Sequence, residues 1–178
     1  MARTKPPLLP EEALYRAVKT ARMDGTLVLA IAGTLALLSA LDKDRVGALV
    51  GIIVSAAGAI ELHGTSLLRA GFHRGVRWLV GSQLYLLAIV VGWAAYRLGH
   101  PDLEPVHKAI IEGNILTDQQ RDAIKQSGMS LDQFLLAAYR LGYAAVIIAT
   151  LLYQGGMALY YARRGRQMAP AFQSTSTE

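Results

Sequence analysis

Four long apolar runs, separated by more polar segments, dominate the pattern of the sequence. They cover residues 25–41, 46–68, 76–98 and 135–161. A helix needs about 20 apolar residues to cross the hydrocarbon core of a bilayer, and these runs are close to that length. None of them alternates strictly between apolar and polar residues, as a strand of a membrane barrel would. The pattern therefore predicts an all-α integral membrane protein, a bundle of four transmembrane helices.

The two ends of the chain are more polar than these runs. In residues 1–24, three prolines prevent a regular helix before Glu11, and an apolar stripe at helical spacing then follows, consisting of Leu14, Ala17, Val18 and Ala21. This segment is expected to form a cytoplasmic amphipathic helix that lies on the membrane. The alternative is that it extends the first span as one long helix. Residues 162–178 end in a Ser/Thr-rich stretch and are expected to be a disordered cytoplasmic tail.

The long connection at residues 99–134 is expected to fold into a small helical cap outside the membrane. Thr117 followed by Gln120 has the spacing of a capping box, in which each residue bonds the backbone of the other at the start of a helix. Ser130 and Gln133 repeat this spacing just before the last apolar run. The connection is therefore predicted to contain short helices rather than an open loop.

Charge indicates the orientation of the spans. Of the 178 residues, 53% are hydrophobic and none is cysteine, and the formal net charge is +5. Most Lys and Arg residues lie in segments 1–24, 69–77 and 162–178, whereas 99–134 is acidic. Basic segments remain on the cytoplasmic side, so both termini are expected inside and Tyr161 is expected at the inner headgroup level. Because the basic residues flank apolar runs, they are not expected to bind nucleic acid.

Glu61 interrupts the second apolar run and is the leading functional candidate. A carboxylate inside a bilayer is costly unless it is paired, hydrated or protonated. Gln83 and Gln154 lie at a matching depth in the third and fourth runs, and Thr34 and Tyr85 could complete a polar layer. Carboxylate and amide oxygens suit a hard cation or a proton-sharing network. Alternatively, these side chains only hold the helices together.

Small residues continue the same face of the second run at helical spacing. Gly47, Gly51 and Gly58 precede Glu61 on this face. Residues without bulky side chains let two helix backbones approach closely. The stripe is therefore predicted to pack against another helix, which directs Glu61 into protein rather than lipid.

The short loop between the second and third runs is basic. Arg69, Arg74 and Arg77 could bind anionic lipid headgroups, or their charges could serve only to set the topology. His63 is the one histidine within a run, so a bis-histidine haem would lack a second ligand. No metal ligands can be identified from the sequence, and no cofactor is expected.

The leading hypothesis for function is an oligomeric channel or transporter for a small ion, with Glu61, Gln83 and Gln154 lining its polar layer. Four helices packed through glycines leave little room for a pathway, so a homo-oligomer is expected. The second hypothesis is a non-catalytic membrane subunit or scaffold whose polar layer is structural. The third is a membrane-embedded enzyme acting on lipophilic substrates at the inner face, although no nucleophile–base motif or catalytic residue is evident.

Overall fold

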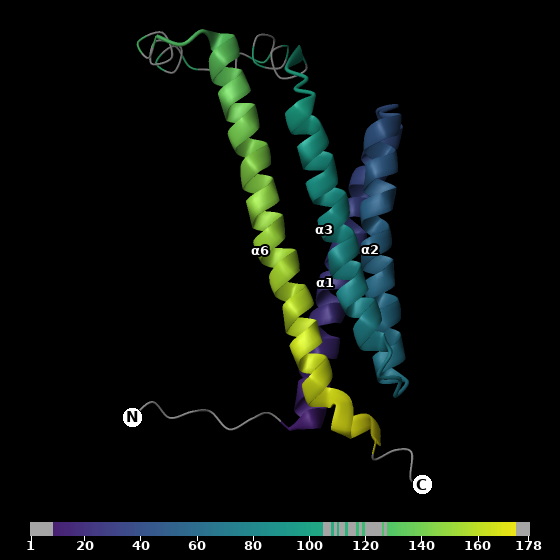
Figure 1. The fold of residues 1–178 in the computed structure, drawn as a ribbon. Coiled ribbons are helices and arrows are strands. Elements are labelled where there is room, and N and C mark those ends of the chain that lie inside the picture. The colour runs from purple at the N-terminus through teal and green to yellow at the C-terminus, as the bar shows by residue number, and fades with distance from the viewer. Residues whose placement is uncertain are drawn as a thin grey trace, which may run out of the picture. The chain divides into compact units, whose positions relative to one another are not determined.

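Four long helices make up most of the computed structural model (Figure 1). It describes residues 9–104 and 128–173, together with isolated positions 108, 110, 113, 117, 119 and 126. The helices are α1 (Pro10–Leu41), α2 (Arg45–Arg69), α3 (Gly75–Gly99) and α6 (Leu131–Gln173). Each is long and apolar enough to cross a membrane. The prediction of four membrane-spanning helices is thus confirmed at the level of helix length and composition, and the chain is a multi-pass membrane protein.

Contacts divide the chain into two compact units, each of which is described by itself. The first unit comprises residues 1–89 and 151–178, and therefore α1, α2, the first part of α3 and the last part of α6. The second unit comprises residues 90–150, with the end of α3 and the start of α6. All buried polar residues discussed below belong to the first unit.

The helices α1 and α2 are joined by a tight turn and pack through glycines. Asp44 caps α2, because its carboxylate accepts a hydrogen bond from the backbone nitrogen of Gly47 at 3.0 Å. A Cβ atom placed on Gly51 would lie 2.8 Å from the Cβ of Ala36 in α1. One placed on Gly58 would lie 2.5 Å from the carbonyl oxygen of Gly25. These positions of α2 therefore lie directly against α1, where only a hydrogen atom fits.

The N-terminal part of α1 is continuous with the rest of that helix. Pro10 occupies its first turn, where the missing N–H of proline removes no helical hydrogen bond. Ala13, Ala17 and Ala21 are fully buried, and they pack in one core cluster with larger side chains of the other helices, namely Leu68, Val76, Leu79, Tyr161 and Met168. Residues 11–24 are thus not a separate helix. The alanines of their apolar stripe are covered by protein, and Leu14 and Val18 are partly buried against the same cluster.

The C-terminal part of α6 corrects the expectation of a disordered tail at residues 162–178. The helix continues to Gln173, and only residues 174–178 lie outside the described part of this segment. Tertiary contacts hold it, since Met168 is fully buried and the ring of Phe172 meets the edge of His73 at 5.5 Å between centroids. Pro170 lies inside this last stretch, and Figure 1 shows a bend of the yellow end of the helix.

The start of α6 shows the capping box that its sequence predicts. The backbone nitrogen of Ser130 donates to Oε1 of Gln133 at 3.1 Å, and the backbone nitrogen of Gln133 donates to Oγ of Ser130 at 3.2 Å. Gly128, two residues earlier, has a φ of +73°, which glycine adopts without strain. The other predicted capping box includes Gln120, which lies outside the described residues.

Candidate functional site: a buried pair of carboxylates

Glu61 is buried on the face of α2 that meets α1. Only 2% of its surface is exposed. A Cβ on Gly25 would lie 3.2 Å from the Cβ of Glu61, so the backbone of α1 passes directly over this side chain. The absence of a side chain at Gly25 therefore creates the space in which the carboxylate lies.

Asp24 is a second buried carboxylate, at the end of the segment 1–24 that the hydropathy pattern leaves outside the spans. Because α1 begins at Pro10 rather than near residue 25, Asp24 lies in the middle of a helix, and 7% of it is exposed. A sequence signal for this position does exist. Asp24 follows Ala21 by three residues and so continues the buried stripe of Ala13, Ala17 and Ala21.

The side chain of Gln83 in α3 joins these two carboxylates. Its Nε2 donates to Oδ2 of Asp24 at 3.1 Å and to Oε2 of Glu61 at 3.0 Å. The primary amide has two hydrogens, so one nitrogen can make both bonds. Gln83 is itself only 1% exposed, and the two carboxylates are therefore held close together inside protein.

Two tyrosines of α6 complete what we call the carboxylate cluster, defined as Asp24, Glu61, Gln83, Tyr153 and Tyr161. The hydroxyl of Tyr153 donates to Oδ1 of Asp24 at 2.9 Å. The hydroxyl of Tyr161 donates to Oε1 of Glu61 at 2.6 Å. Each of the four carboxylate oxygens thus accepts one hydrogen bond. The three donor atoms belong to α3 and α6, and the acceptors belong to α1 and α2.

The carboxylate cluster contains more acceptors than donors and carries no basic side chain. In the part of the chain that the structure describes, every hydrogen bond to Asp24 and Glu61 side chains comes from a neutral amide or hydroxyl. The Oε1 atom of Gln83 is buried and has no partner among the described residues. Two ionised carboxylates at this spacing would repel each other in a medium that solvates charge poorly. A shared proton or a bound small cation would remove that repulsion.

The remaining members of the predicted polar layer do not join this cluster. Thr34 lies on an exposed face of α1, because depth in a span does not determine which face a residue occupies. The hydroxyl of Tyr85 donates to the carbonyl oxygen of Ile53 at 3.1 Å and so links α3 to α2. Gln154 is buried, and its Oε1 has no partner within the described residues. It lies seven residues before Tyr161, on the same face of α6.

Tyr161 is the member of the cluster that most clearly departs from expectation. Its position between an apolar run and basic residues predicts a ring at the headgroup level, whereas the side chain is fully buried in protein and its hydroxyl donates to Glu61. An aromatic residue beside basic residues at the end of a span has the same sequence pattern in either position. The spacing of seven residues from Gln154 is the one feature of the sequence that indicates an inward-facing, polar stripe on this helix.

Among the described residues, no group of three His, Asp or Glu side chains comes together as a metal site. His63 is exposed and meets the edge of the Trp78 ring, with 5.0 Å between centroids. In the basic loop, the guanidinium of Arg74 lies over the ring of Phe72, and Arg77 is exposed.

No protein-family model matches this chain, and no curated protein or solved structure matches it.

Proposed function

We propose that this protein is a membrane transporter that binds a proton or another small cation between Asp24 and Glu61. The observation that carries the proposal is the pairing of two buried carboxylates, inside helices that can span a membrane, with neutral donors alone. Intramembrane carboxylates of this kind are costly unless their charge is balanced, and they mark proton and ion pathways in many membrane proteins.

The chemistry of the carboxylate cluster suits a ligand that binds reversibly. With one proton on the pair, a single negative charge remains, shared by groups that already accept hydrogen bonds from Gln83, Tyr153 and Tyr161. Loss of that proton leaves two charges, which favours an arrangement that admits water or a new cation. The unpartnered Oε1 of Gln83 supplies a further oxygen for a hydrated or bare cation.

Release of the ligand from Glu61 requires movement or a partner subunit, because this end of the carboxylate cluster is closed within one chain, whereas Tyr153 beside Asp24 is 52% exposed. Tyr161 is fully buried, and Glu61 is only 2% exposed. The close glycine contacts between α1 and α2 favour their motion as one body, while the two tyrosine donors belong to α6. We therefore propose that a shift of α6 against α1 and α2, within a homo-oligomer, opens the site.

The proposed orientation has both termini in the cytoplasm. The ends of α2 and α6 that carry Arg69, Arg163 and Arg164 then lie at the inner leaflet. Glu61 precedes Arg69 by eight residues, which corresponds to about 12 Å along a helix. The site would thus lie closer to the cytoplasmic side than to the outer side.

A scaffold or accessory subunit is the second candidate, and the hydrogen bonds already made by the carboxylate cluster favour it. All four carboxylate oxygens are already satisfied, as in a network that fixes four helices in one arrangement. In that case neutralising one carboxylate would change stability but there would be no flux to lose.

Flux measurements in reconstituted vesicles separate these two functions. Wild-type protein is compared with Asp24→Asn and Glu61→Gln, which keep size and hydrogen-bonding capacity but cannot ionise. Asp42→Asn, at an exposed turn position, is the matched control. We expect proton or alkali-cation flux that both cluster variants abolish and the control retains. Full flux in the Glu61→Gln variant would refute the proposal, and absence of flux through wild-type protein would favour the scaffold.

A further inference from the structure

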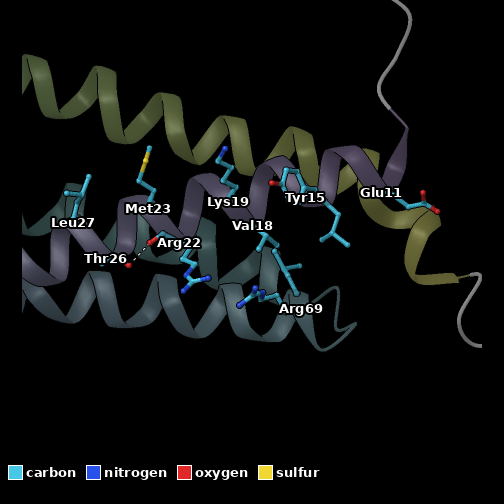
Figure 2. Close-up of a pocket in the computed structure, with 11 residues that line it drawn as sticks. Glu11, Tyr15, Val18, Lys19, Arg22, Met23, Thr26, Leu27 and Arg69 are labelled. Carbon is cyan, nitrogen blue, oxygen red and sulfur yellow. Dashed lines mark hydrogen bonds between the residues drawn. The ribbon is translucent and has the colours of Figure 1, made fainter.

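A groove runs along the first unit between the N-terminal half of α1 and the C-terminal end of α2. Its volume is about 1040 Å³. Small-molecule pockets usually range from about 300 to 1,000 Å³, so this space is large enough for an extended ligand. Its lining residues in α1 include the exposed Glu11, Lys19 and Arg22, which are labelled in Figure 2.

The lining of the groove combines two kinds of side chain. The apolar lining residues are Leu14, Val18, Met23, Leu27 and Leu68, and Figure 2 shows Met23 and Leu27 on the opposite side of α1 from Val18. Three cations, Lys19, Arg22 and Arg69, lie beside it, and Figure 2 shows Arg22 and Arg69 reaching from neighbouring helices to the same side. In the part of the chain that the structure describes, none of these three cations forms an ion pair with a carboxylate.

In the part of the groove from Lys19 to Leu27, the cations come first along α1 and the apolar residues Met23 and Leu27 follow them. Arg69 is the last residue of α2, and Lys19 and Arg22 precede the apolar run of α1. From Lys19 to Leu27 the groove follows α1 for about 12 Å toward the middle of the span. A ligand that fits has a compact negative charge at one end and a hydrocarbon chain at the other.

We infer that this groove binds an anionic phospholipid. Its phosphate lies between Arg22 and Arg69, since guanidinium groups bind phosphate oxygens through paired hydrogen bonds. Lys19 adds a third positive charge, and one acyl chain extends across the outward face of α1 to Met23 and Leu27. Charge complementarity favours an anionic over a zwitterionic lipid, because three unpaired cations face a single acidic lining residue, Glu11. The site is separate from the carboxylate cluster and does not depend on the transport function.

Native mass spectrometry of the detergent-solubilised protein tests this inference. Phosphatidylglycerol is compared with phosphatidylcholine of identical chains and with soluble glycerol phosphate, which has the headgroup but no chain. We expect preferential binding of phosphatidylglycerol. The Lys19→Gln/Arg22→Gln/Arg69→Gln variant should bind it on the order of 100-fold more weakly, because each basic residue near a membrane surface contributes roughly fivefold.

A second triple variant controls for the loss of net charge. Lys43→Gln/Arg45→Gln/Arg166→Gln removes three exposed cations outside the groove and should leave binding unchanged. Leu27→Trp places a larger side chain at the apolar end of the groove without changing charge, and it should weaken phosphatidylglycerol binding.

Three results would overturn the inference. They are equal losses in the two triple variants, equal affinity for the two lipids, and binding of glycerol phosphate as tight as that of phosphatidylglycerol. A dimer that Leu27→Trp dissociates without altering lipid selectivity would assign the groove to a second copy of the chain instead.

Discussion

Replacing Tyr161 by Phe removes one hydroxyl group from the carboxylate cluster and leaves the buried ring in place. The hydroxyl donates to Oε1 of Glu61 at 2.6 Å, and the residue has no exposed surface. Water is therefore not available to replace the lost donor. Hydrogen bonds between helices in membrane proteins contribute about 0.6 kcal/mol on average and up to about 1.7 kcal/mol. Bonds to charged groups contribute about 1.5–3 kcal/mol.

The size of the effect therefore reports the charge on Glu61. A protonated Glu61 predicts that Tyr161→Phe lowers the free energy of unfolding by about 0.6–1.7 kcal/mol, and by the same amount in a Glu61→Gln background. An ionised Glu61, balanced by a bound cation, predicts a loss of about 1.5–3 kcal/mol that falls clearly in the Glu61→Gln background. Measuring Tyr161→Phe in both the wild-type and the Glu61→Gln protein cancels those effects of the substitution that do not involve the hydrogen bond to Glu61.

Unfolding in mixed micelles with increasing denaturing detergent provides the measurement. Tyr160→Phe is the matched control, because the neighbouring hydroxyl makes no hydrogen bond in the described part of the chain. It should change stability by less than about 0.5 kcal/mol, as most substitutions away from special contacts do. If Tyr161→Phe is as neutral as this control, the bond to Glu61 does not form and the cluster as described is incorrect.

Two further predictions concern orientation and the start of α6. Because the chain has no cysteine, single cysteines at Thr4, Asn114 and Ser174 can be tested with an impermeant thiol reagent on intact cells, and only position 114 should be labelled; labelling of either terminal site would reverse the proposed orientation. Ser130→Ala removes one bond of the capping box and should lower stability by about 0.5–2 kcal/mol, whereas Ser130→Asp should largely preserve it; equal stability of the two variants would mean that the cap contributes little.

The sequence was sufficient to predict the helices, because a membrane span is determined by length and apolarity alone. It was also sufficient for the glycine face of α2, where a spacing of three and four residues identifies one side of a helix. The sequence did not indicate which other helix each helix face contacts. Glu61 and Gln83 were recognised at similar depth, but Thr34 satisfied the same criterion and lies on an exposed surface.

A single cause explains why the sequence pattern assigns neither Asp24 nor Tyr161 to the buried carboxylate cluster. Hydropathy places the end of a span where charges begin, so a carboxylate or a tyrosine at that boundary is assigned to the headgroup region. In this protein α1 and α6 both continue beyond that boundary and pack together with α2 and α3 in one core cluster. Residues at the apparent membrane edge are therefore buried by protein, which a hydropathy pattern cannot distinguish from the interface.

The close contact of α1 and α2 sets the distance between the two carboxylates, and this leads to a last prediction. Gly25 follows Asp24 directly, and Gly58 precedes Glu61 by one helical turn. A Cβ on Gly58 would lie 2.5 Å from the carbonyl oxygen of Gly25 and 2.7 Å from the backbone nitrogen of Leu29. Both atoms belong to the backbone, so Gly58→Ala can be accommodated only if the two helices separate.

Separation of α1 from α2 should break the bridge that Gln83 makes to both carboxylates at 3.0 and 3.1 Å. We therefore expect Gly58→Ala to abolish the proposed flux and to lower stability by about 1–3 kcal/mol, the range for overpacked sites. Gly81→Ala is the control, because a Cβ there meets nothing within 4 Å. It should be neutral or slightly stabilising, since alanine favours a helix more than glycine does. If both variants retain wild-type flux and stability, the glycine contact does not position the carboxylates, and the spacing of the pair must be set by α3 and α6 alone.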